Sequence, residues 1–351
     1  MFRHANRGVV ISIYSAMCIM LLISIVIATN IGAVSVSPSI VFKIIVNNIA
    51  GENIFDPNEW DFAKESIIWN LRFPKVIVTA FTGAGLAICG IYMQVLTKNT
   101  LADPYILGIS SGAASGATLS ILIGSLPVIG SFSIQVGAFF GALISIALVM
   151  IIAGKSWSDG VTRLVLVGMA VASLFSAVTN FIIFITPDSR KLNSALFWMT
   201  GSFSGVSWSD MPPVIVCVAI GILVSIGIHG NLDAMLLGET MAGTKGVDTK
   251  KIKIIIVVVS TLITAVLVSI SGVIGFVGLV IPHIGRMVMG TMHRKNIPIS
   301  MLLGANFMVW ADAVARVCIA PSEMPVGVIT SLIGVPFFLF MIRKSRYGFG
   351  G

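Results

Sequence analysis

Charged residues are scarce in this sequence. Only 10% of its 351 residues are Asp, Glu, Lys or Arg, whereas about 25% are charged in typical soluble domains. Hydrophobic residues make up 56%, and the mean hydropathy is +1.02. So few charges cannot hydrate the surface of a globule of this size, which excludes a soluble enzyme, a nucleic-acid-binding domain and a disordered regulator. The composition indicates a polytopic membrane protein with no nucleic-acid partner.

The sequence also lacks the motifs of nucleotide and metal sites. Gly154-Lys155-Ser156 resembles the end of a phosphate-binding loop, but the glycine that such a loop needs five positions earlier is Val149. The four histidines are dispersed, so we expect no metal site. The four cysteines form no CxxC pair and are typical of small core residues. We therefore expect a chain that is not an enzyme and binds no cofactor.

Ionisable residues are few within the apolar runs. Asp312 and Arg316, four positions apart on one helix face, are the clear case, and such a pair most often forms an internal ion pair. An ion-coupled secondary transporter usually carries several ionisable groups near the midplane of the bilayer. An intramembrane enzyme would need a clustered catalytic set. These two classes remain as alternatives, but the sequence favours a transporter whose energy source is a partner chain.

Long apolar runs between short polar breaks predict one all-α transmembrane domain over residues 1–351. In hydrocarbon every backbone N–H and C=O group needs an internal partner, so the runs are expected to be helices of about 20 residues. The ten expected spans cover residues 9–33, 73–96, 106–127, 134–153, 162–186, 211–229, 253–271, 273–291, 299–318 and 325–342.

The distribution of positive charge predicts the orientation. With both termini in the cytoplasm, roughly twice as many lysines and arginines lie on the cytoplasmic side as on the outer side, as expected for a membrane protein. Residues 35–70 then form an acidic outer segment that contains Trp60 and Trp69. Residues 230–252 form the longest cytoplasmic loop, and its mixture of apolar and charged residues predicts a short helix that docks on a partner or lies on lipid.

Several signatures in the sequence resemble one family of transporters. The first extends over residues 71–75, 83–87, 99–104 and 107–113 and includes Gln94; the second covers residues 275–286 and is followed by Asp312, Arg316 and residues 323–327. A third begins at Leu236. Together they resemble the permease subunits of ABC importers for iron–siderophore complexes, haem and cobalamin, the FecCD or type II importer family. Thr100 departs from the family pattern, which usually has proline there.

The resemblance implies a particular assembly in the cytoplasmic (inner) membrane of a prokaryote. A second permease subunit, identical or related, lies beside this one, and the solute path runs between the two. Two cytoplasmic ATPase subunits bind ATP and Mg, and an extracytoplasmic binding protein delivers the substrate. Ferric siderophore is the favoured substrate because it is frequent in the family, with haem and cobalamin as alternatives.

The resemblance also assigns roles to three sets of residues. One set couples the chain to the ATPase, with a bend at a glycine and apolar contact residues. A second set is expected to pair with carboxylates of the binding protein. The alternative for Arg72 and Lys75 is that their side chains only extend toward lipid headgroups. A third set lines or closes the path, although glycines at four-residue spacing are also typical of close helix packing. The coupling residues are Leu236, Leu237, Gly238, Glu239, Ala242 and Gly246; the docking residues are Arg72, Lys75 and Arg316; the path or gate residues are Val161, Thr162, Gly108, Ser111 and Gly112.

Overall fold

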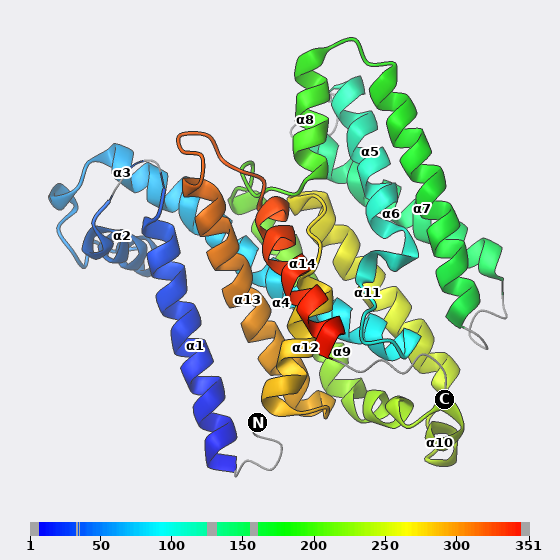
Figure 1. The fold of residues 1–351 in the computed structure, drawn as a ribbon. Coiled ribbons are helices and arrows are strands. Elements are labelled where there is room, and N and C mark those ends of the chain that lie inside the picture. The colour runs from blue at the N-terminus through cyan, green and yellow to red at the C-terminus, as the bar shows by residue number, and fades with distance from the viewer. Residues whose placement is uncertain (1–6, 33, 35, 125–131, 155–160, 345–351) are drawn as a thin grey trace.

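The computed structural model describes residues 7–32, 34, 36–124, 132–154 and 161–344. In these residues the chain is a bundle of helices without a β-strand (Figure 1), which confirms the all-α prediction. The first turn of α1 and the last turns of α14 point toward the end of the bundle that carries α10, and α2, α3 and α8 lie toward the opposite end. We call these the α10 end and the α8 end.

A helix lies at each of the ten expected spans. Eight of these helices, among the described residues, are long and apolar enough to cross a membrane, whereas α5 and α12 are shorter. The ten are α1 (Arg7–Asn30), α4 (Phe73–Thr97), α5 (Ile109–Ile123), α6 (Ser133–Ala153), α7 (Val161–Phe184), α9 (Met211–Leu236), α11 (Thr249–Ser271), α12 (Val277–Met289), α13 (His293–Val317) and α14 (Val326–Lys344).

The short helix α12 corrects the predicted continuous span over residues 273–291. Its 13 residues rise only about 20 Å, less than the roughly 30 Å of a bilayer core. Residues 272–276 are not helical, because Gly272 and Phe276 have positive φ angles of 66° and 69°. The Tyr105 hydroxyl bonds both backbone groups of Ile274, donating to the oxygen at 3.1 Å and accepting from the nitrogen at 3.3 Å. Non-helical backbone inside the membrane needs such protein partners.

Shorter helices lie in the connections between the long ones, and α10 is the short helix that the sequence predicts within residues 230–252. The helix α8 begins where the Asp188 side chain accepts from the backbone of Arg190 and Lys191, a standard N-cap. In the 35–70 segment, buried Val41, Ile44 and Trp60 form a small core of their own. The shorter helices are α2 (Pro38–Ala50), η1 (Pro57–Glu59), α3 (Phe62–Ser66), the π-helical η2 (Ile67–Arg72), η3 (Pro104–Leu107), α8 (Ser189–Met199), η6 (Trp208–Asp210) and α10 (Glu239–Thr244).

The helix α4 is the centre of the bundle. All but three of its residues are buried, and α9, α11, α12 and α13 pack around it. Glycines allow the closest of these contacts: a Cβ on Gly83 would overlap the carbonyl oxygen of Gly304 in α13. A Cβ on Gly90 would likewise overlap the carbonyl of Gly278 in α12. The backbones of α4, α12 and α13 therefore touch directly, as small residues permit in membrane bundles.

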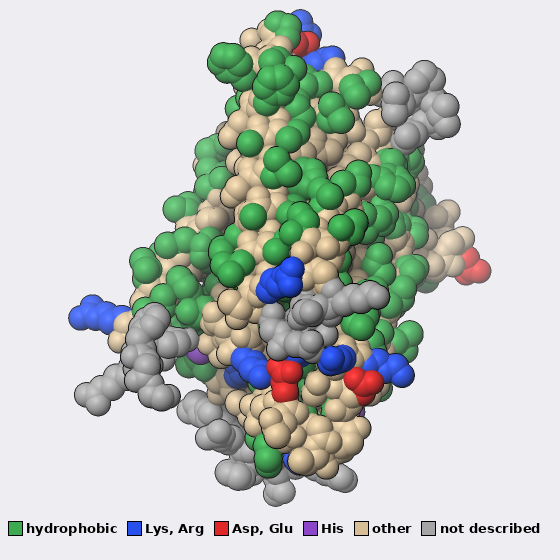
Figure 2. All heavy atoms as spheres, turned by 90° about the vertical axis from the view of Figure 1, so that its right-hand side faces the viewer, with side chains coloured by type: hydrophobic (Ala, Val, Ile, Leu, Met, Phe, Trp, Pro, Cys, Tyr) green, Lys and Arg blue, Asp and Glu red, His purple; other side chains and the backbone are tan. Residues whose placement is uncertain are grey.

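The surface of the bundle is predominantly apolar between its two ends. Figure 2 shows hydrophobic side chains over most of the height of one face, with most of its lysines, arginines and acidic residues at the top and in the lower part. Large exposed side chains such as Leu22, Phe181, Leu223 and Leu332 belong to four different long helices. This distribution is that of a protein embedded in hydrocarbon.

Candidate functional site

The corner between α9 and α10 presents apolar side chains at the α10 end. Leu236, Leu237 and Met241 are 48%, 58% and 53% exposed, whereas Ala242 is fully buried against the bundle. Gly238 joins the two helices with a φ of +105°, a conformation that residues with a Cβ rarely adopt. The predicted bend at Gly238 is present, and a compact apolar patch on an otherwise charged end is typical of a protein-binding surface.

Gly246 completes this corner at the other end of α10. Its φ is +79°, and the backbone N–H groups of Gly246 and Val247 donate to the carbonyls of Gly243 and Ala242. This closure satisfies carbonyls that a helix leaves open at its C-terminus. Asp248 then caps α11 by accepting from the Lys251 nitrogen at 3.0 Å. The structure thus brings all six predicted coupling residues into one corner.

Glu239 connects this corner to the bundle through two lysines. Its Oε2 lies 2.7 Å from Nζ of Lys253 in α11, and its Oε1 lies 3.1 Å from Nζ of Lys98 at the end of α4. Burial alone would raise the pKa of the Glu239 carboxyl, but hydrogen bonds from Lys253 and Lys98 outweigh it and hold that pKa below its ordinary value. The carboxylate is therefore charged at neutral pH. Sequence analysis gave no role to either lysine.

The three predicted docking cations have a different environment from the one expected. Arg72, Lys75 and Arg316 are only 8%, 6% and 5% exposed, and all of them bond within the chain. A docking contact would require these side chains to project from the α8 end, whereas in this structure they turn into the chain. The reason is that each side chain bends inward to a carboxylate or a carbonyl that would otherwise be unpaired. The structure contains no partner, so the docking role itself stays a prediction.

Two of these cations hold the end of α1. Arg72 donates to the carbonyl oxygens of Asn30 at 2.9 Å and Val34 at 2.6 Å, and its guanidinium packs so closely on Gly32 that a Cβ there would collide with it. Arg316 Nη1 donates to the carbonyl of Ile31 at 2.8 Å. Positive charge at a helix C-terminus is favourable because the carbonyls there carry partial negative charge.

The third cation lies in a buried ion cluster. Lys75 Nζ is 2.8 Å from Glu323 Oε2 and 3.6 Å from Asp312 Oδ1. Asp312 Oδ2 lies 3.0 Å from Nε of Arg316, which confirms the predicted internal pair between these two residues. Glu323 belongs to the loop after α13 and is about one-third exposed, so it is the member of the cluster that solvent reaches most readily. Sequence analysis quoted Glu323 within a motif but gave it no role.

The predicted path residues divide into two groups. Thr162 is exposed and Val161 is half-buried at the start of α7, but Gly108 and Gly112 are buried and Ser111 is half-buried. A Cβ on Gly112 would overlap the carbonyl of Gly141 in α6. In this chain Gly108 and Gly112 therefore allow neighbouring helices to pack closely, which was the alternative explanation of their four-residue spacing. Neither glycine forms part of an exposed surface that could line a path.

A polar stripe on α7 was missed by the sequence analysis. The helix buries only one face, at Leu164, Gly168, Val171, Thr179 and Ile182. On the opposite face Ser173, Ser176 and Asn180 are exposed along a long apolar helix. Thr162, already named as a gate residue, lies on the same face beyond the exposed Leu166 and Met169. Polar residues within a membrane span usually face a protein partner or a water-filled path, so this stripe is the best candidate for a path-lining surface. Their helical spacing was the signal that could have revealed it.

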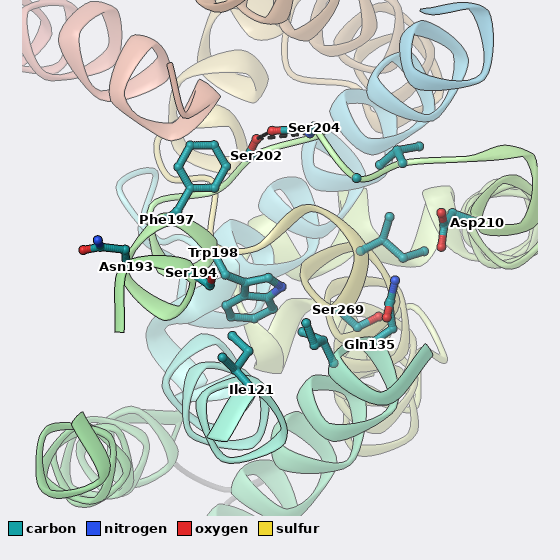
Figure 3. A pocket seen from close by; sticks show the side chains of 14 residues that line it. Ile121, Gln135, Asn193, Ser194, Phe197, Trp198, Ser202, Ser204, Asp210 and Ser269 are labelled. Atoms are coloured by element: carbon teal, nitrogen blue, oxygen red, sulfur yellow. Dashed lines mark hydrogen bonds between the residues drawn. The ribbon is translucent and has the colours of Figure 1, made fainter. Parts of the chain in front are cut away.

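Figure 3 shows a cavity of about 490 Å³ between α5, α6, α8 and α11, in the α8 half of the bundle. Trp198 and Phe197 lie on one side, and the hydroxyls of Ser202 and Ser204 bond each other at its edge. Asp210 lies at the far side, but its Oδ2 accepts at 2.9 Å from both the nitrogen and the hydroxyl of Ser207. That carboxylate therefore caps a turn, and the remaining lining is a mixture of uncharged polar and apolar side chains.

Metal-binding side chains do not cluster in the part of the chain that the structure describes. No three His, Cys, Asp or Glu side chains lie close enough there to hold one ion. His293 lies beside Asp233, with Nδ1 2.6 Å from Oδ1, but this pair joins α13 to α9.

Comparison with known proteins places the chain in a family. The model of the FecCD transport family matches residues 20–344. The chain belongs to the FecCD transport family. This FecCD chain is 41% identical over 280 residues to the cobalamin import system permease protein BtuC of Halobacterium salinarum, covering 80% of this chain and 74% of the relative. It is 38% identical over 290 residues to the Fe(3+)-citrate import system permease protein YfmD of Bacillus subtilis, covering 82% and 84%.

A solved structure agrees with the fold of the FecCD chain. The similar chain comes from a transporter assigned to the metal-chelate ABC type in an inward-facing conformation. The TM-score is 0.79 at 30% identity, and the match covers 95% of this chain and 99% of the other. The resemblance stated from the signatures is thus confirmed over nearly the whole sequence.

Proposed function

We propose that this FecCD chain is the membrane-spanning permease subunit of an ABC importer for a metal chelate. The observation that carries the proposal is the α9–α10 corner, where Leu236, Leu237 and Met241 are exposed around the bend at Gly238. A bundle without a nucleotide motif needs an external motor, and this corner offers it an apolar contact surface. ATP hydrolysis then belongs to two separate ATPase subunits, which bind the ATP and Mg.

The solute path lies between this chain and a second permease subunit, which is the same chain or a related one. The exposed polar stripe of α7, with Thr162, Ser173, Ser176 and Asn180, supports this arrangement because such a face is costly against lipid. We place the α10 end in the cytoplasm of a prokaryotic cell and the α8 end outside its inner membrane, where a binding protein delivers the substrate. The excess of positive residues toward the α10 end supports this orientation.

For the substrate we propose a ferric siderophore or a similar iron chelate. Relatives named for cobalamin and for ferric citrate have similar identities to this chain, so cobalamin and haem remain alternatives. The cavity of Figure 3, whose lining apart from the capping Asp210 is uncharged, and the uncharged stripe on α7 support a large solute that is held by few charges. The choice among chelates is then made largely by the binding protein.

The test is reconstitution of the chain with its candidate ATPase and binding protein in proteoliposomes. We expect uptake of radiolabelled iron chelate only when ATP is enclosed with the ATPase and the binding protein is present outside. Cobalamin and haem tested in the same way decide the substrate. Uptake that follows a proton or sodium gradient without ATP would instead establish an ion-coupled secondary transporter.

A further inference from the structure

Lys253 is a buried charge in a region where the proposed docking surface does not require one. It lies in the second turn of α11, its side chain is 1% exposed, and its Nζ donates to Glu239 at 2.7 Å. Burying an ammonium group is unfavourable unless it is paired, and an apolar residue would fill the same space at less cost. A buried lysine here therefore points to a requirement beyond packing.

The helix α10 is connected to the chain through a glycine at each end. Gly238 and Gly246 flank it, both have positive φ angles, and a Cβ on either would meet no atom within 4 Å. Glu239 is the first residue of α10, and its two carboxylate oxygens contact Lys253 in α11 and Lys98 at the end of α4. The ion pairs thus join a six-residue helix to two of the long helices of the bundle.

The two lysines differ in a way that separates their roles. Lys98 is 47% exposed, so water competes for it and its pair with Glu239 is weak. Lys253 is shielded from water, so its pair is both stronger and more rigid. The Lys253 contact also leads directly into α11, which packs against α4, α6 and α9.

We infer that the Glu239–Lys253 pair is the link that transmits a displacement of the α9–α10 corner into α11, with Lys253 as a positioning residue. The inference rests on the proposed function, in which the ATPase moves this corner. With the pair intact, α10 and the start of α11 move together. Without it, α10 pivots on Gly238 and Gly246. ATP hydrolysis then continues, but less of the displacement that it causes is transmitted to the helices of the path.

The test measures substrate transported per ATP hydrolysed by the complete complex in proteoliposomes. Lys253→Met keeps the length of the side chain and removes its charge. We expect ATPase capture and hydrolysis within about twofold of wild type, but at least about a fivefold fall in transport per ATP. Lys245→Met, on an exposed lysine directly after α10, is the matched control and should stay within about twofold.

A second variant keeps the test decisive if Lys253→Met does not fold. Glu239→Gln removes the same pair from the solvent-accessible side and should give the same loss, and the double variant should be no worse than either single one. Normal transport per ATP in folded Lys253→Met or Glu239→Gln would overturn the inference. So would loss of ATPase binding in Glu239→Gln alone, because Glu239 would then contact the ATPase itself. A wild-type complex without ATP-driven transport would instead contradict the proposed function.

Discussion

At the α8 end Arg72, Lys75 and Arg316 turn inward and bond to carbonyls and carboxylates, whereas at the α10 end Leu236 and Leu237 turn outward into solvent. The usual expectation, with charges outside and leucines inside, is reversed at both ends. The difference indicates that the α8 end is braced internally, and that the α10 end is incomplete without a partner. Signatures of the same family can therefore serve opposite structural purposes.

The largest predicted effect comes from breaking the buried ion cluster at the α8 end. Asp312→Ala leaves Lys75 and Arg316 buried with fewer negative partners, so we expect a loss of about 3–5 kcal/mol in the free energy of unfolding. Thermal unfolding of the purified chain in detergent measures it. Asp61→Asn, which removes an exposed pair with Lys64, should cost less than about 0.5 kcal/mol. Equal melting temperatures for the two variants would show that the cluster does not brace this end.

Arg72→Met tests whether the brace is also a docking site. The variant loses the bonds to Asn30 and Val34, each of the charge-assisted kind worth about 1.5–3 kcal/mol, so we expect destabilisation of that order. Binding-protein affinity, measured on the fraction that remains folded, should stay within about threefold of wild type. A large loss of affinity with unchanged stability would instead support the docking role and would mean that the arginine leaves these carbonyls on binding.

A smaller effect on stability, but a clear one on assembly, is expected at the α10 end. Leu237→Ser removes apolar area from a side chain that is 58% exposed, so the free energy of unfolding should change by less than about 0.5 kcal/mol. ATPase affinity should fall by about tenfold, because apolar anchors at the centre of an interface carry much of its binding energy. Leu223→Ser, on the lipid-facing part of α9, is the matched control and should leave ATPase binding unchanged.

The smallest effect concerns pH. Because its lysine partners hold the pKa of Glu239 below the ordinary 4.5, the folded state favours the charged carboxylate. The stabilisation is thus fully present above pH 4.5 and is lost as the pH falls through the lower pKa of the folded state. The difference in melting temperature between wild type and Glu239→Gln should be constant from about pH 5.5 to 8 and shrink below 4.5. A difference that grows on acidification would contradict the assigned pairing.

Much of the fold could be predicted because hydrophobic length is a direct property of the sequence. The limits were local. Nothing in the run 273–291 shows that Phe276 takes a positive φ, because a tyrosine more than 150 positions away supplies the partner for Ile274. The helix α8 was missed because its polar residues, beginning with the Asp188 cap, fall below a hydropathy criterion and are visible only as a capping pattern.

The candidate site shows the same division between local and distant information. The bend at Gly238 could be predicted because the third signature, Leu236 to Glu239, is a local pattern and the resemblance implies a bend at its glycine. The burial of Arg72 is not, since it depends on where the end of α1 lies in space. Gly112 could be read either as packing or as a path wall, and only its contact with Gly141 decides between them.

The direct backbone contacts at Gly83 and Gly90 have a mechanical consequence. Where helices touch through their backbones, no side chains lie between them that could shift to allow movement. The helices α4, α12 and α13 therefore cannot slide or tilt against one another at these contacts without overlap of their atoms. These three helices therefore form one rigid unit. Under the proposed function, alternating exposure of the path would then come from helices with fewer buried residues, such as α7, which buries only one face.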